Sequence, residues 1–404
     1  MNPNAWYLSL VLLFALVDLL VLLRVYVLLK NHPLRFYWRG MLAIWSIICI
    51  GFCIAWMWRL GLLGGTRDPA PRSLVAAQYI WHFLFLPVLV IGLLIDGAIR
   101  FARSGWKHLW LSDESPAPPT ENPTAAAINR SRRQFLASAA FVAAPIATAG
   151  LAEAGMGQIG AFRQRFYDLS LAGWPQKLDG YTITVIADVH VGVFSTPKML
   201  DDIVAAGNAL DSDLVLLPGD LINVSHRDLP AALDMVLRLN SHDGVYLIEG
   251  NHDVVEGPGD FDDAVRRRGI NLLVDQAATL STRGASFQLL GTRWTSDQFR
   301  DDSVAYTASL RDPSLFAIMM AHHPHSWDMA MQYDIPLVIS GHTHGGQIML
   351  TRNIGLGRLR FHYLSGLYET ENSKLIVSNG VGNWFPLRIG APAEILQITL
   401  RSKT

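Results

Sequence analysis

The sequence has very little cysteine and comparatively little charge. Two cysteines in 404 residues exclude a disulfide framework and a cysteine-rich zinc module. Charged residues make up 17% of the chain, below the roughly 25% that is typical of soluble domains, whereas apolar residues make up 50%. The net charge of -1 lacks the basic surplus of a dedicated nucleic-acid binder. This composition excludes a disordered chain and indicates a globular part joined to a membrane part.

Three long apolar runs lie in the first quarter of the chain, at residues 5–29, 41–57 and 74–95. Each run approaches the roughly 20 residues that a helix needs to cross the hydrocarbon core of a bilayer. Buried helices of a soluble domain are the alternative, but three such runs seldom occur together in soluble proteins. We therefore expect residues 1–110 to form a transmembrane region of three helical spans.

Asp18 stands inside the first of these runs, where a charge in hydrocarbon is costly. A carboxyl group at this depth is either functional or faces the interior of the helix bundle, where it is uncharged or paired, for example with Arg24. The second interpretation is the one that the sequence favours.

A polar, proline-rich linker is expected at residues 111–133, followed by a fourth apolar segment at residues 134–155. Residues 131–136 (SRRQFL) place two arginines ahead of a moderately apolar run, as twin-arginine export signals do. The alternative is a plain fourth transmembrane helix with basic anchors. Either interpretation carries the following residues across the membrane, and the first adds the Tat translocase as a partner.

The distribution of lysine and arginine predicts the topology, because basic residues are enriched on the cytoplasmic side. Three follow the first span and six follow the third, while none precedes the first span and three lie in the second loop. This pattern places the N-terminus outside, and it places the loop after the first span and the region after the third span inside. The C-terminal part then lies on the extracytoplasmic side of a multi-pass protein.

From about residue 160 the sequence resembles an α/β domain of about 240 residues, a normal size for one domain. Short apolar runs of strand length occur at residues 181–187, 214–217, 245–248, 316–320 and 337–339. Helical segments fit between them, for example at residues 198–210 and 229–240. This alternation predicts a layered α/β architecture with buried strands.

Residues of the kinds that bind metal ions follow each of these five runs. The blocks are Asp188-Val189-His190, Gly219-Asp220, Gly250-Asn251-His252-Asp253, His322-His323-Pro324 and Gly341-His342-Thr343-His344. Ligands of α/β sheets bind at the carboxyl ends of the strands, so we expect the five blocks to meet there. One such block is common in solvated loops, but five in order are not expected by chance.

Together the blocks supply carboxylates, imidazoles and an amide oxygen, a mixture that suits Mn²⁺, Fe²⁺ or Zn²⁺. They are too many for one four-coordinate ion and about the right number for two. Two ions roughly 3.5–4 Å apart can hold both the attacking and the leaving oxygen of a phosphoryl displacement. We therefore expect two divalent ions that share one carboxylate, with hydrolysis by a hydroxide that bridges them.

The ordered blocks resemble the calcineurin-like metallophosphoesterase superfamily, whose pattern is D-x-H, G-D, G-N-H-[DE], H and G-H-x-H. The resemblance covers roughly residues 180–400 and implies that residues 160–404 form an αββα sandwich, in which two mixed sheets are flanked by helices. It implies one ion held by Asp188, His190 and His344, a bridging Asp220, and a second ion completed by Asn251, His322 and His342.

The resemblance gives His252 another role, facing the phosphate as a charge stabiliser or as the acid that protonates the leaving oxygen. His323 is the alternative to His322 as a ligand, because the two are adjacent. Arg388 is a candidate for a phosphate contact. The tail, with residues 366–368, 375–382, 386–388 and 392–394, resembles a bacterial, membrane-associated subfamily of phosphodiesterases.

The expected function is that of a metal-dependent phosphoric ester hydrolase of the bacterial cell membrane, acting on phosphodiesters more than on monoesters. A membrane tether suits a phospholipid or lipid-linked substrate. The alternative is a transporter or sensor bundle with an accessory phosphoesterase domain, which Asp18 favours. Nucleases and protein phosphatases of the superfamily share the ligand set, but the absence of a basic surplus argues against a specific nucleic-acid partner.

Overall fold

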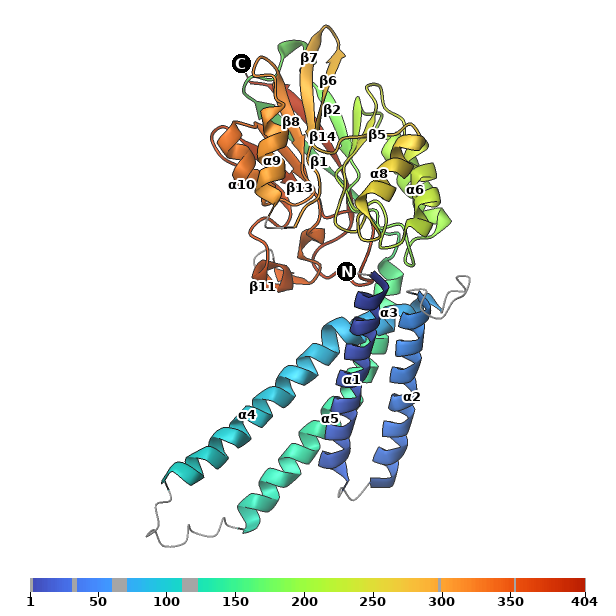
Figure 1. The fold of residues 1–404 in the computed structure, drawn as a ribbon, viewed down its shortest axis with the longest axis vertical. Helices are drawn as coiled ribbons and strands as arrows, with labels where there is room; N and C mark the ends of the chain where they lie inside the picture. The colour runs from blue at the N-terminus through green and yellow to red at the C-terminus, as the bar shows by residue number, and fades with distance from the viewer. Residues whose placement is uncertain are drawn as a thin grey trace. The chain divides into compact units, whose positions relative to one another are not determined.

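The computed structural model describes residues 3–30, 35–59, 71–110, 123–296, 299–351 and 354–403. The chain divides into two compact units, Met1–Met156 and Gly157–Thr404. The first unit contains helices, and the second is a layered arrangement of strands and helices (Figure 1).

The helices of the first unit contain four stretches that are long and apolar enough to cross a membrane. The elements are α1 (Pro3–Leu29), α2 (Arg35–Arg59), α3 (Arg72–Ile80), a π-helical turn (Trp81–Phe85), α4 (Leu86–Trp110) and α5 (Pro123–Gln158). The four candidate spans are Leu8–Val27, Arg35–Met57, Arg72–Ile99 and Ser138–Gln158. The three apolar runs and the fourth segment of the sequence each coincide with one of these spans.

Helix α5 begins earlier than the sequence predicts. Residues 111–122 of the expected linker lie outside the described residues, but residues 123–133 are already helical. Three alanines at residues 125–127 favour a helix there, and a proline such as Pro123 is tolerated in a first turn. The twin-arginine pair falls in this segment, and its side chains are outside the described part of the chain. The export signal therefore stays a prediction.

Asp18 is buried in the interior of the helical unit, but its partners differ from the suggested one. Its carboxylate accepts a hydrogen bond from Nε1 of Trp81 at 2.8 Å and lies 3.3 Å from Nε2 of His82. Both residues belong to the π-helical turn, whose extra residue lets two consecutive side chains reach the same carboxylate. Arg24 instead pairs with Asp96 at 3.0 Å.

The second unit is built on two six-stranded sheets. The first has the order β1-β14-β2-β3-β4-β5 and the second β12-β13-β9-β8-β7-β6. The first consists of β1 (Arg163–Leu171), β2 (Tyr181–Val185), β3 (Leu214–Leu217), β4 (Val245–Leu247), β5 (Asn271–Leu272) and β14 (Glu394–Ser402). The second consists of β6 (Gln276–Thr282), β7 (Ala285–Gly291), β8 (Phe316–Met320), β9 (Leu337–Ser340), β12 (Gly366–Glu369) and β13 (Lys374–Val377). A separate small ribbon pairs β10 (Met349–Thr351) with β11 (Ile354–Gly355).

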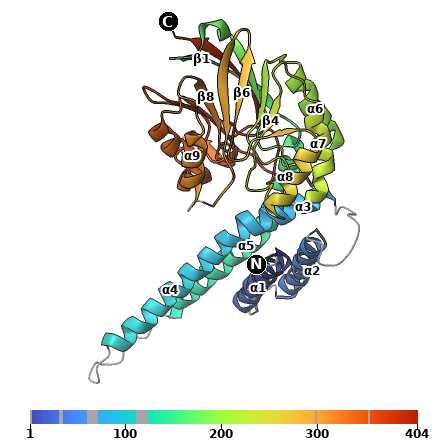
Figure 2. The ribbon, with the colours of Figure 1, turned by 45° about the horizontal axis from the view of Figure 1, so that its top comes forward.

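Helices cover the outer face of each sheet (Figure 2). They are α6 (Pro197–Asn208), α7 (Leu229–Leu237) and α8 (Pro258–Arg267) on the first sheet, with α9 (Arg300–Ser309) and α10 (Ser326–Ala330) on the second. The predicted αββα sandwich is thereby confirmed.

Strand β3 shows why its sequence is apolar without interruption. Leu214 and Leu216 pack in the core between the two sheets, while Val215 and Leu217 pack against the outer helices. A strand buried on both faces has no position left for a polar residue. Strands β2, β3, β4 and β5 are parallel, as are β7, β8, β9 and β13. Their carboxyl ends therefore lie along one edge of each sheet.

Replacing Asp18 with alanine should destabilise the helical unit. The change leaves the Trp81 N–H without its acceptor in apolar surroundings, which costs about 1–3 kcal/mol. Thermal unfolding of the full chain in detergent measures the effect. Leu19→Ala is the matched control, because Leu19 neighbours Asp18 in the sequence but is 52% exposed and lies outside the buried interior of the helical unit. Equal unfolding temperatures for the two variants would contradict a structural role for Asp18.

Candidate metal centre

The seven predicted ligand residues come together where strands of the two sheets end. Asp188 and His190 follow β2, Asp220 follows β3 and Asn251 follows β4. From the second sheet, His322 follows β8, and His342 and His344 follow β9. Because these strands are parallel within each sheet, their ends bring residues far apart in the sequence to one place.

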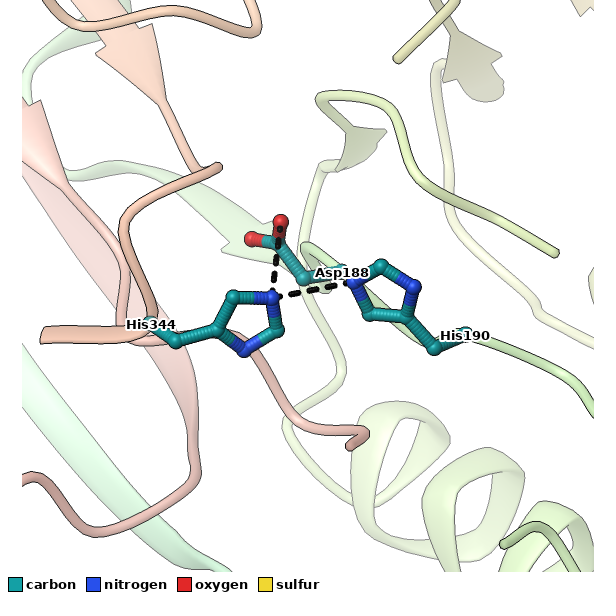
Figure 3. Close-up of side chains that lie close together, drawn as sticks. All are labelled: Asp188, His190 and His344. Atoms are coloured by element: carbon teal, nitrogen blue, oxygen red, sulfur yellow. Dashed lines mark hydrogen bonds and ion pairs between the residues drawn. The ribbon is translucent and has the colours of Figure 1, made fainter. Parts of the chain in front are cut away.

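The first cluster consists of Asp188, His190 and His344, whose side chains point toward one another (Figure 3). Nε2 of His344 lies 3.0 Å from Nε2 of His190 and 3.7 Å from Oδ1 of Asp188. All three residues are buried, and one potential ligand atom from each lies within 4.8 Å of the others. They combine the ends of strands from both sheets.

The second cluster is centred on Nε2 of His322. The atoms around this nitrogen are Oδ2 of Asp220 at 3.2 Å, Oδ1 of Asn251 at 3.1 Å and Nδ1 of His342 at 3.1 Å. Asp220 also reaches the first cluster, because its Oδ2 lies 3.5 Å from Nε2 of His190. One buried carboxylate thus stands between two sets of ligand atoms.

The donor set fits divalent cations better than it fits a hydrogen-bond network. Nε2 of His322 can carry one proton, yet it faces three atoms with lone pairs. Two carboxylates, four imidazoles and an amide oxygen meet in a place from which water is largely excluded. Such a surplus of lone pairs over protons is what borderline metals such as Mn²⁺, Fe²⁺ and Zn²⁺ need.

Burial sets the protonation of these side chains. It lowers the pKa of His190, His342 and His344 well below the usual range, so the rings are neutral and keep a lone pair for a cation. It also raises the pKa of Asp188 to about 7. Burial acts to lower the pKa of His322, but the adjacent Asp220 carboxylate overrides it and raises the pKa to about 9. A proton on His322 thus occupies the place where a cation would balance the Asp220 charge.

Five of the seven residues have a left-handed backbone, which is uncommon outside glycine. They are Asp188 (φ 52°), His190 (φ 48°), Asp220 (φ 55°), His342 (φ 72°) and His344 (φ 50°). Such strain persists only where the surrounding structure enforces it, and it gathers at functional sites. The glycines of the blocks leave room for the carboxylates. A Cβ on Gly250 would collide with the carboxylate of Asp220, and one on Gly341 with that of Asp188.

The structure distinguishes His322 from its neighbour His323. The ring of His323 lies 6.2 Å from that of Trp294 and 5.7 Å from that of Phe361, and its Nδ1 accepts a hydrogen bond from the backbone N–H of His325 at 3.2 Å. Within the described residues it belongs to none of the ligand clusters, whereas His322 does. The geometry supports His322 as the ligand from this block.

His252 lies beside the carboxylate shared by the two clusters. Its backbone N–H donates to Oδ1 of Asp220 at 2.8 Å, and its ring nitrogen Nδ1 donates to the carbonyl of Asn223. The ring stands edge-on to His190, with centroids 4.6 Å apart, and a ring nitrogen is within 4.8 Å of ligand atoms of His190 and Asp220. Because Nδ1 keeps its proton, only a doubly protonated ring can donate from Nε2.

Arg388 makes contacts other than the expected phosphate contact. Its guanidinium is buried and donates to the carbonyls of Gly382 at 2.6 Å and Asn379 at 2.8 Å, and one of its nitrogens lies 2.8 Å from Nδ1 of His344. Arg388 therefore packs behind the ring of His344. The sequence could not show this, because the turn that wraps around the guanidinium is formed by residues before and after Arg388.

Two further residues support the site and have no role in the sequence-based prediction. Asp253 accepts hydrogen bonds from the backbone N–H groups of Ile222 at 3.0 Å and Gly250 at 2.8 Å, which ties together the loops after β3 and β4. The indole of Trp294, beyond the end of β7, lies 5.3 Å from the ring of His342. Trp294 follows the carboxyl end of β7, just as the five blocks follow their strands, and this position could have identified it from the sequence.

Comparison with known proteins places this site in a family. Residues 181–346 match the calcineurin-like phosphoesterase family, which confirms the predicted resemblance. The chain is 31% identical over 226 residues to an uncharacterized metallophosphoesterase of Campylobacter jejuni, covering 55% of this chain and 59% of the relative. It is 28% identical over 246 residues to a transmembrane protein with metallophosphoesterase domain of Danio rerio, covering 56% and 54%. It is 26% identical over 283 residues to the phosphodiesterase YaeI of Escherichia coli, covering 67% and 99%.

The chain spans about 60% of the length of the first curated relatives that it matches. The family match itself lies in the C-terminal unit, at residues 181–346. Proteins of this family bind divalent metal ions. The histidine and aspartate clusters are groups that could hold such ions.

Replacing Asp220 with alanine should remove bound metal, because both clusters lose the carboxylate between them. The metal content of the purified full chain, measured by elemental analysis, is expected to fall. Asp312→Ala is the control, since this carboxyl group is exposed and bonds only to Ser314 among the contacts described for it. Two ions retained by the Asp220 variant would contradict the bridging position.

Proposed function

We propose that this chain, whose C-terminal half carries a calcineurin-like phosphoesterase domain, is a membrane-anchored phosphodiester hydrolase that uses two divalent ions. The position of Asp220 carries the proposal. Its Oδ2 lies 3.5 Å from Nε2 of His190 and 3.2 Å from Nε2 of His322, which belong to different clusters. A shared carboxylate between two ligand sets is the arrangement that a pair of ions roughly 3.5–4 Å apart requires.

Each cluster would hold one ion. Asp188, His190 and His344 would bind the first, and Asn251, His322 and His342 the second, with Asp220 between them. When bound, Mn²⁺, Fe²⁺ or Zn²⁺ supplies Lewis acidity, which makes hydroxide available near neutral pH and offsets charge on the phosphoryl oxygens. The left-handed backbone of the ligands persists only where the surrounding packing enforces it, which supports a preorganised site.

His252 would be the proton donor to the leaving oxygen. Its ring is held by Nδ1, which donates to the carbonyl of Asn223, and by the backbone bond to Asp220. The remaining nitrogen, Nε2, is then the one that can give a proton when the ring is protonated. His252 is partly exposed, whereas the buried ligand His190 beside it is not, so a substrate can reach it.

Other parts of the proposal rest on similarity and on the membrane spans. Similarity to a protein named a phosphodiesterase, matched over 99% of its length, supports diesters over monoesters. Four candidate spans support a substrate in or near a bilayer, such as a phospholipid or a lipid-linked diester. The lysine and arginine distribution supports a bacterial cell membrane protein whose C-terminal unit is extracytoplasmic, delivered as a multi-pass protein or with the Tat translocase.

Replacing His252 with alanine should lower turnover about 10²–10⁴-fold on a diester with an alkyl leaving group, since general acid catalysis contributes that much. The loss should be smaller on bis-p-nitrophenyl phosphate, whose leaving group departs without a proton. Kinetics on both substrates, with metal analysis, measure this difference. The control is His242→Ala, because His242 is exposed and contacts Asp211. Equal losses on both substrates, or loss of an ion, would show that His252 is not the acid.

A further inference from the structure

The segment after the metal-binding loops presents an unusual group of exposed apolar side chains. We call residues 348–351 and 354–361 the apolar lobe; it contains β10, β11 and the short helix Leu356–Leu359. The exposed fractions are 79% for Leu350, 60% for Ile354, 54% for Leu356 and 86% for Leu359. With the adjoining Ile389, these make up five of the eleven large apolar side chains that are exposed in the described part of the second unit. Such concentration marks an interaction surface.

The lobe is a folded structure whose base is fixed to the domain. The backbone N–H of Met349 donates to the carbonyl of Ile389 at 2.8 Å, and that of Ile389 donates to Gln347 at 2.9 Å. Met349 itself is buried, while Leu350 beside it is exposed. The exposed leucines are therefore held outward by a defined backbone.

The lobe also borders the metal centre. It begins four residues after His344, and its last residue, Phe361, packs edge-on against the ring of His342 at a centroid distance of 5.5 Å. A partner that covers the lobe would therefore lie next to the candidate metal centre.

The chain enters the domain beside this lobe. Gln158, the last residue of α5 and of the fourth candidate span, accepts a hydrogen bond from the backbone N–H of Arg388 at 3.0 Å. Ile389, the next residue, is the one that pairs with Met349. Residues 159–162 alone separate Gln158 from β1. Within the second unit, β11 lies at the end opposite to the C-terminus of the chain (Figure 1).

The stretch of sequence that contains the lobe carries charge of one sign. No acidic residue occurs from Ile335 to Tyr368, whereas Arg358 and Arg360 lie within the lobe. The guanidinium of Arg360 is exposed and lies over the ring of Phe361 at 5.7 Å. Exposed leucine and isoleucine with neighbouring arginine is the composition of surfaces that enter the interface of an anionic bilayer.

We propose that the apolar lobe is a membrane-contact surface that enters the headgroup region of a lipid bilayer and holds the metal centre at the membrane surface. The arrival of the chain at this end of the domain from a candidate span favours a bilayer over a protein partner. This contact requires that the fourth candidate span crosses a membrane, but it does not require that the chain hydrolyses phosphodiesters. If the proposed function also holds, the contact favours a lipid phosphodiester as the substrate.

A fluorescent label at Leu359 in the full chain tests the contact. Leu359→Cys, in a background with Cys49→Ala and Cys53→Ala, is labelled with an environment-sensitive fluorophore and reconstituted into vesicles of phosphatidylcholine and phosphatidylglycerol. We expect a blue shift of the emission and its quenching by lipids that carry a nitroxide near the headgroup. The matched control is Tyr306→Cys on α9, which is 56% exposed and outside the lobe, and it should show neither effect.

The other outcomes overturn the bilayer contact. Emission at the wavelength found in water, without quenching, shows an uncovered lobe. A blue shift that the nitroxide lipids do not quench shows that a second copy of the chain or another protein covers it. Hydrolysis of a soluble phosphodiester by the same labelled chain is measured in parallel. Activity with an unquenched label refutes the contact alone. Quenching of the labelled chain, when neither it nor the wild-type chain hydrolyses the diester, refutes the proposed function alone.

Discussion

The burial of the Asp220 carboxylate between two sets of histidines is the constraint on which the C-terminal unit depends. A buried anion is unfavourable unless positive charge or hydrogen bonds offset its desolvation. Here the backbone N–H of His252 donates to the carboxylate, and the carboxylate raises the pKa of the adjacent His322 to about 9 against the effect of burial. The same carboxylate is within reach of both clusters. One buried negative charge is thus shared by two sets of ligand atoms.

The layered fold supplies the rigidity that this arrangement needs. Strands such as β3 are held from both faces, by the opposite sheet and by the outer helices. This packing keeps the loops at their ends in the strained, left-handed backbone that five ligands adopt. Around the ligands, Asp253 ties two loops together and Arg388 packs behind the ring of His344. A flexible scaffold could not keep so many lone pairs directed at one place.

The sequence predicts the local features well and the distant pairings poorly. An apolar run such as residues 214–217, bounded by turn residues, indicates a buried strand, and the blocks after the strands carry candidate ligands in order. The αββα sandwich is implied by the family resemblance that these blocks carry. The partners of Asp18 are 63 and 64 residues away, and Arg24 pairs with a residue 72 positions distant. Nothing in local spacing selects these partners. Likewise, the sequence suggests Arg388 as a phosphate contact, but only the fold shows that backbone carbonyls surround its guanidinium.

The most direct test of the central claim is anomalous diffraction at the manganese edge from crystals of the full chain grown with Mn²⁺. The account predicts two peaks roughly 3.5–4 Å apart, one beside Asp188, His190 and His344 and the other beside Asn251, His322 and His342, with the Asp220 carboxylate between them. A single peak, or two peaks that Asp220 does not join, would contradict it.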